Sequence, residues 1–259
     1  MDHISYVTFI DADDWIDRVT LGTCISEIGN SDILLFNLCD YNDSCCIEKR
    51  VLKSEKVVFD GQEIEYLVDI LLTDRTEYGS GAISLTGAVC KLYRGNLLET
   101  CMFPESLLSG EDCCFILQGL KRARRVTYIN KVLYHRRINK NSLSHNHNCL
   151  FLEQRLDYVN WILDFFKDEK EKRWKQLNEF CFVNYCNVVG HIADNSEIKL
   201  KDKLVKAKEF KRGIHFNWDF KEIVINEENK NRKRIKQYLA RGKSALVFLF
   251  FEFYKRLRK

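Results

Sequence analysis

The stretch VTFIDADDWID, residues 7–17, decides how the first half of the chain is interpreted. Its opening residues are apolar or β-branched, and together with Tyr6 they predict a buried strand at Tyr6–Ile10. Asp11, Asp13 and Asp14 follow at once, so three carboxylates gather where the strand ends. Ligands of open α/β sheets bind at the C-terminal ends of strands. Crowded carboxylates repel one another, and Mg²⁺ or Mn²⁺ would relieve that repulsion.

The same cluster also fits a simpler structure, a solvated turn that caps a helix. One metal motif is excluded by its spacing, because an EF-hand loop needs glycine at its sixth position. Counted from Asp11, that position is Ile16.

Composition places the chain among globular proteins. It has 259 residues, of which 46% are hydrophobic and 30% charged. The net charge of +4 is too small to indicate a nucleic-acid partner. The eleven cysteines include no CxxC pair and no secretory signal begins the sequence, so we expect reduced thiols in a cytoplasmic protein. No apolar run reaches the ~18 residues of a membrane span.

Apolar spacing predicts an α/β region at 1–146 followed by a mainly helical region at 147–259. Gly29–Asn30, which follow an apolar stripe, are expected to end one helix. The capping-box pair Asp60 and Glu63 is expected to begin another. The predicted strands are Ile33–Leu38 and Val126–His135, with Ile47–Phe59 extended. The predicted helices have inner stripes at Leu21, Ile25 and Ile28, at Ile64, Val68 and Leu71, and along Leu152–Phe166, followed by a helix at Trp174–Ile192.

Four blocks in order resemble the family 2 glycosyltransferases, whose fold is called GT-A. They are YVTFIDADDWID at 6–17, NSDILLF at 30–36, the segment Cys90–Phe115 with KLYR and ED, and the segment Lys131–Asn146 with LYHRR. The resemblance implies a partial GT-A, Rossmann-like sheet. It also implies transfer of a sugar from a nucleotide-sugar donor to a polysaccharide or glycolipid acceptor, with inversion at the anomeric carbon.

The family pattern assigns roles to the carboxylates. Asp13 would contact the metal and the diphosphate, because a cation neutralises the charge that develops on that leaving group. Asp11 would lie nearer the nucleotide, and Asp14 would support the site. Asp112 would be the general base for the acceptor hydroxyl, with Glu111 beside it. Without the resemblance, Glu111 and Asp112 are simply a helix start, and the two interpretations are compatible.

Further residues follow from the same resemblance. Lys91 and Tyr93 match the acceptor-side segment. Arg137 matches a loop that closes over phosphates, where a guanidinium is a suitable bidentate partner. The loop also holds Arg136, Ser142 and Ser144.

The main departure from the family is at the front. Relatives carry further βα units before the acidic motif, whereas ten residues precede Asp11 here. We therefore expect most of the nucleotide-binding half to be missing or supplied by a partner chain. The strand at Tyr6–Ile10 would then lie at an edge, and UDP-sugars would bind weakly. A second hypothesis follows, a non-catalytic remnant that binds a membrane or a partner.

The segment SALVFLFFEFYKRLRK, 244–259, is apolar and aromatic and ends in basic residues. Such a segment can lie in a membrane interface, and it would hold the protein on the cytoplasmic face. The alternative is a helix that packs its phenylalanines on the domain.

Overall fold

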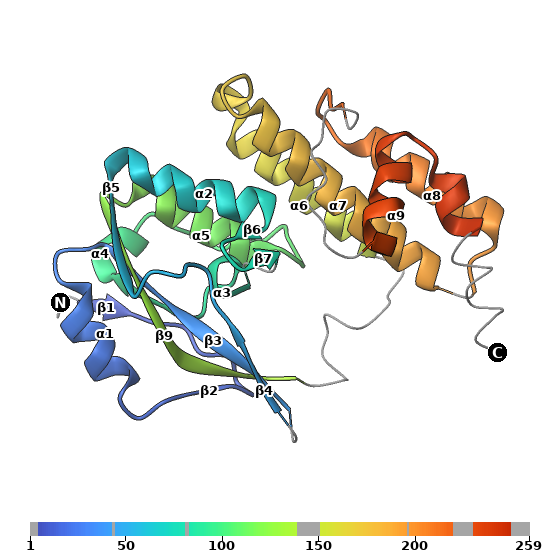
Figure 1. Ribbon diagram of the computed structural model, residues 1–259. Helices are drawn as coiled ribbons and strands as arrows, with labels where there is room; N and C mark the ends of the chain where they lie inside the picture. Colours follow the sequence, from blue (N-terminus) through green and yellow to red (C-terminus); the bar gives the residue numbers. More distant parts are fainter. Residues whose placement is uncertain are drawn as a thin grey trace. The chain divides into compact units, whose positions relative to one another are not determined.

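The computed structural model describes residues 5–42, 45–80, 83–138, 151–195, 197–219 and 230–249. The chain divides into two compact units, Met1–Asn146 and His147–Lys259. The first is α/β and the second is helical, which confirms the predicted fold class (Figure 1).

Two long parallel strands, β3 (Ile33–Asn42) and β9 (Arg125–Arg137), form the centre of the sheet. Both were predicted, and both are longer than expected. Short antiparallel strands flank the pair: β8 (Lys91–Arg94) and β4 (Cys45–Lys49) along β3, and β5 (Lys56–Asp60) and β2 (Trp15–Ile16) along β9.

The predicted strand at Tyr6–Ile10 is shorter than expected. Only β1 (Tyr6–Val7) pairs, with β8, and it lies at the edge of the sheet as the sequence indicated. The extended region Ile47–Phe59 is two strands, because β4 and β5 pair with different partners.

Helices cover both faces of the sheet (Figure 1). Successive residues of a strand point to opposite faces, so the buried residues of β3 need a cover on each side. Ile28 of α1 (Thr20–Ile28) lies in the same buried cluster as Leu34. On the other face, Ile33 reaches Gly119 of α5 (Glu111–Arg122), which packs beside α2 (Ile64–Thr73).

The predicted inner stripe of α1 is right at Ile28 and wrong at its two other positions. Leu21 and Ile25 are exposed, whereas Thr20, Cys24 and Ile28 are buried at intervals of four. The Thr20 hydroxyl donates a hydrogen bond to the carbonyl of Leu133 at 3.0 Å, which fixes this face against β9. The capping box at Asp60 and Glu63 is confirmed and opens a short 3₁₀ turn, Gly61–Glu63, before α2.

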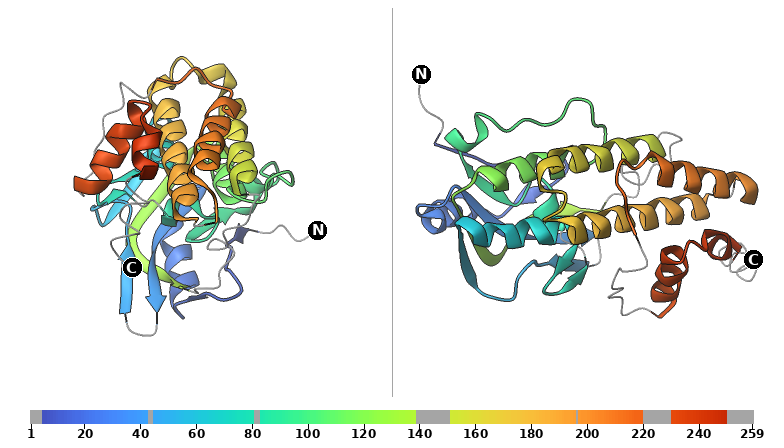
Figure 2. Two further views of the ribbon diagram at one scale, coloured as in Figure 1. Left: turned by 90° about the vertical axis from the view of Figure 1, so that its right-hand side faces the viewer. Right: turned by 90° about the horizontal axis from the view of Figure 1, so that it is seen from above.

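Short elements complete the first unit: β6 (Arg75–Thr76), β7 (Gly79–Ser80), α3 (Ile83–Thr86) and α4 (Gly95–Leu98). In the second unit, α6 (Phe151–Phe165), α7 (Trp174–Asp194) and α8 (Leu200–Gly213) lie side by side (Figure 2). A 3₁₀ turn, Lys167–Glu169, joins the first two, and α9 (Lys230–Ala240) contacts α7. Both predicted long helices are confirmed.

Across the described ranges, none of the helices is long and apolar enough to cross a membrane. Two expectations fall partly or wholly outside those ranges. The segment 244–259 is described to Leu249, and Ser142 and Ser144 are not described.

The expectation that all cysteines are reduced is wrong for one pair, because Cys39 and Cys46 form a disulfide. The β3–β4 register places Cys46 opposite Tyr41, diagonally across from Cys39. The two Cα atoms are therefore 5.9 Å apart, within the range that a disulfide spans. Sequence spacing could not show this pairing, because it depends on the hairpin register.

Lys91 is a fully buried cation in the core of the first unit. Its ammonium donates hydrogen bonds to the carbonyls of Ser84, Gly87 and Val89 at 2.6–2.9 Å. All three donors are thus used to hold the chain segment that leads into β8.

Replacing Lys91 with methionine should lower the free energy of unfolding by roughly 3–5 kcal/mol, because three buried carbonyls lose their partner. Chemical denaturation followed by circular dichroism measures the change. Lys131→Met is the matched control, since Lys131 is half exposed and pairs only at the surface with Glu27. An equal cost for both variants would contradict the structural role.

Candidate functional site

The acidic stretch forms a turn that carries the chain from β1 on one side of the sheet to β2 beside β9. The N–H of Asp14 donates to the carbonyl of Asp11 at 3.1 Å and closes this turn. Asp11 and Asp13 are exposed to solvent, while Asp14 is half-buried. The geometry separates Asp14, whose carboxylate is bonded to β9, from the more exposed Asp11 and Asp13.

Tyr134 of β9 fixes the acidic turn. Its hydroxyl accepts the N–H of Asp11 at 3.1 Å and donates to Oδ2 of Asp14 at 2.7 Å. The other oxygen of Asp14 accepts the backbone N–H of Arg137 at 2.9 Å. Both carboxylate oxygens of Asp14 therefore accept hydrogen bonds from β9.

An aromatic cluster brings the second acidic pair to the turn. Phe9, two residues before Asp11, contacts Tyr93 and Phe115 with ring centroids 5.8 and 5.5 Å apart. Phe115 stacks on Phe103 at 4.2 Å. Because Phe115 lies three residues after Asp112 in α5, this packing places Asp112 near Asp11, far from it in sequence.

The carboxylates are close enough to perturb one another. Burial raises the pKa of Asp11, and the charges of Asp14, Asp112 and Asp13 raise it further, whereas Arg136 lowers it. Burial also raises the pKa of Asp112, the adjacent Glu111 adds to the effect, and the backbone N–H of Ala88 and the charge of Lys91 lower it. The raised pKa values mean that Asp11 and Asp112 hold their protons more tightly than isolated aspartates.

Glu111 contributes a buried acceptor to the same site. Its Oε2 atom is buried and has no hydrogen-bond partner among the residues that the structure describes. A buried carboxylate oxygen without a partner is costly, so it is typical of functional sites rather than of ordinary helix starts.

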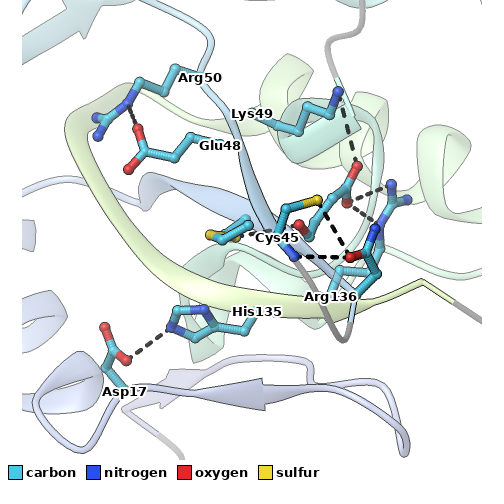
Figure 3. The surroundings of a disulfide bond; sticks show 11 residues. Asp17, Cys45, Glu48, Lys49, Arg50, His135 and Arg136 are labelled. Carbon is cyan, nitrogen blue, oxygen red and sulfur yellow. Dashed lines mark hydrogen bonds and ion pairs between the residues drawn. A yellow bond between two sulfur atoms is a disulfide. The ribbon is translucent and has the colours of Figure 1, made fainter.

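The two arginines of LYHRR lie on opposite faces of β9. Arg136 forms an ion pair with Asp40 at 2.7 Å (Figure 3), and its charge reaches Asp11. Arg137, the predicted donor contact, instead places its guanidinium over the ring of Trp15 at 5.6 Å. Of Arg137, only the backbone N–H reaches the acidic turn. Arg136 is therefore the arginine whose side-chain charge acts on the acidic turn.

His135 was given no role from the sequence, and it lies on the Trp15 face. It stacks on Trp15 with centroids 5.2 Å apart, and its Nε2 is 2.9 Å from Asp17 (Figure 3). These contacts anchor β2 to β9 beside the acidic turn.

The predicted acceptor contacts Lys91 and Tyr93 are corrected by the structure. Both side chains are fully buried, so neither can touch an acceptor directly. The Tyr93 hydroxyl donates to the carbonyl of Ala88 at 3.0 Å. Since the N–H of Ala88 donates to Asp112, the two residues support the backbone that orients this carboxylate.

The residues suit a cation that arrives with its ligand better than a resident one. Within the described ranges, no three His, Cys, Asp or Glu side chains gather closely enough to hold a metal by themselves. Asp11 and Asp13 have no hydrogen-bond or ion-pair partner for their carboxylates among those residues. Mg²⁺ is often bound by one or two carboxylates together with phosphate oxygens, a pattern that these two aspartates fit.

No family model matches the chain. Over 146 residues, or 54% of the chain, it is 32% identical to the glycosyltransferase GlyA of Streptococcus pneumoniae serotype 4. The chain spans 20% of the length of that relative.

Two solved structures share the fold. The crystal structure of S. aureus TarS 1-349 in complex with UDP-GlcNAc has a TM-score of 0.59 at 20% identity, covering 98% of this chain and 68% of that one. TarS 1-349 alone gives 0.56 at 20% identity, covering 98% and 67%. The chain is thus similar in sequence to part of a glycosyltransferase and similar in fold to TarS.

Proposed function

We propose that this chain carries the diphosphate and acceptor side of a GT-A glycosyltransferase that uses a nucleotide-sugar donor. The single observation that carries the proposal is the approach of Asp11 to Asp112. Asp11 comes from the turn after β1, which also holds Asp13, and Asp112 comes from the start of α5, beside Glu111. The charge of Asp112 acts on Asp11 although nothing local in the sequence requires the two residues to meet.

In this mechanism Asp112 is the general base. Its carboxylate takes the proton of the acceptor hydroxyl while the oxygen attacks the anomeric carbon. The bond to the diphosphate breaks on the opposite side, so the configuration inverts. A divalent cation, when bound with the donor, would neutralise charge on the departing diphosphate. Asp13 would hold it, and Asp11 would lie on the nucleotide side.

The donor is proposed from the structural relative. TarS 1-349 was crystallised with UDP-GlcNAc, and the family resemblance points to nucleotide-sugars generally. The acceptor class, a polysaccharide or glycolipid, rests on the resemblance alone.

The second candidate function is that of a chain that keeps the acidic site but does not convert a nucleotide-sugar by itself. It is favoured by the coverage of GlyA, which is a fifth of that protein. Hydrolysis of UDP-GlcNAc by the chain, with Mn²⁺ present, separates the two candidates. The first predicts hydrolysis that Asp13→Asn abolishes and that Asp168→Asn, an exposed aspartate of the second unit, leaves unchanged. No hydrolysis by any of the three proteins favours the second candidate.

Asp112→Asn should separate catalysis from folding. The turnover number for donor hydrolysis should fall roughly 10²–10⁴-fold, the usual contribution of a general base. The melting temperature at pH 7 should rise, because the raised pKa of Asp112 shows that its charged form is disfavoured in the fold. This gain in melting temperature should vanish below the ordinary aspartate pKa of about 3.9, where the Asp112 carboxyl of the unmodified protein is protonated in both the folded and the unfolded state. Lower activity together with a lower melting temperature would indicate a structural role instead.

The pH profile should follow the same residue. Because burial and Glu111 raise the pKa of Asp112, the acid limb of the turnover number should lie above the pKa of an isolated aspartate. Glu111→Gln should shift this limb to lower pH, since it removes the neighbouring negative charge. A limb that Glu111→Gln does not move would exclude Asp112 as the titrating base.

A further inference from the structure

The corner where α9 ends is built by a defined turn. Gly242 adopts a left-handed backbone with φ of 72°, which ends the helix without strain. The N–H of Lys243 donates to the carbonyl of Tyr238 at 2.8 Å, and the N–H of Gly242 donates to that of Leu239 at 2.9 Å. This pair of bonds is a Schellman motif, and a helical stretch, 244–249, follows directly. The corner is therefore a fixed structure.

The helical stretch has an inner and an outer side. Val247 and Phe248 are fully buried, and Ser244 hydrogen-bonds to Tyr185 of α7. Leu246 and Leu249 point outward and are 46% and 50% exposed. The expectation that the phenylalanines of this segment pack on the domain thus holds for Phe248, while two leucines remain available to a partner.

The segment that carries the exposed leucines is rich in positive charge. Residues 230–249 include seven Lys and Arg and no Asp or Glu. Among them, Arg241 and Lys243 are exposed at the corner itself, beside the partly exposed ring of Tyr238. The second unit as a whole has 25 Lys/Arg against 16 Asp/Glu, a net +9, whereas the first has 16 against 21, a net −5.

We propose that this corner, formed by Tyr238, Arg241, Lys243, Leu246 and Leu249, docks on an anionic lipid bilayer. Cations attract the surface of such a bilayer, and exposed leucines insert at the boundary between headgroups and acyl chains. A soluble polyanion would use the cations but would gain nothing from the leucines. The combination therefore favours lipid, and it stands independently of the proposed transferase activity.

The test is flotation of the whole chain with two kinds of vesicles, pure phosphatidylcholine and phosphatidylcholine with 30% phosphatidylglycerol as roughly a bacterial-like anionic fraction. Binding should need the anionic lipid and should weaken as salt is raised. Leu246→Asp should reduce partitioning roughly ten-fold or more, because an apolar side chain that would insert into the bilayer is replaced by a charge that the bilayer repels. The double variant Arg241→Glu/Lys243→Glu should abolish binding.

Matched controls lie on α8 of the same unit. Val205 is 44% exposed, so Val205→Asp makes the same kind of change at the same exposure. The double variant Lys208→Glu/Arg212→Glu reverses two positive charges, as the corner variant does, in a stretch that already holds the acidic Glu209. Both controls should bind nearly as well as the native chain, and circular dichroism melting should show that every variant is folded.

Three results would overturn the proposal. One is equal loss of binding in the α8 controls, which would show only a general effect of net charge. Another is vesicle binding that Leu246→Asp and Leu249→Asp leave unchanged. The third is retention of inorganic polyphosphate, with no vesicle binding, by the native chain and by Leu246→Asp alike.

Discussion

The parallel pairing of β3 with β9 is the constraint on which the first unit depends. Every other strand of that sheet joins one of these two strands directly, except β1, which joins through β8. The register also decides which side chains share a face. Asp40 lies opposite Arg136 and Leu38 opposite Tyr134, whereas His135 and Arg137 point to the other side. A shift of one residue would exchange these faces and remove Tyr134 from the acidic turn.

The acidic site is held together against its own electrostatics. Neighbouring carboxylates raise the pKa values of Asp11 and Asp112, and one Glu111 oxygen is buried without a partner among the described residues. The surrounding residues offset this repulsion. The Tyr134 hydroxyl donates a hydrogen bond to Asp14, the N–H of Ala88 donates one to Asp112, and the buried ammonium of Lys91 acts on the same Asp112 carboxylate. Clusters of acids with such a cost are more typical of binding or catalytic sites than of purely structural turns.

The sequence predicted what depends on local pattern. Apolar runs located β3 and β9, and the capping box located the start of α2. The acidic blocks gave a candidate site, which stays a prediction. What it could not supply depends on long-range packing. The inner face of α1 was misassigned because Cys24, not Leu21 or Ile25, meets the sheet. Lys91 was assigned to the acceptor side from the resemblance. Lysine is rarely buried, and the carbonyls that hold its ammonium are visible only in three dimensions. Tyr134 was unremarked since its role arises from the β9 register.

The placement of β1 and β2 has a consequence for how the chain is made. Their partners are β8 and β9, so Tyr6 pairs near Arg94 and Trp15 pairs near His135. At ribosomal rates of roughly 5–20 residues per second, on the order of ten seconds separate the synthesis of Trp15 from that of its partner. Until β8 has been made, the apolar run before Asp11 has no strand to join, and a chaperone is a natural protector of such a segment. The acidic site is completed only after residue 137 has left the ribosome.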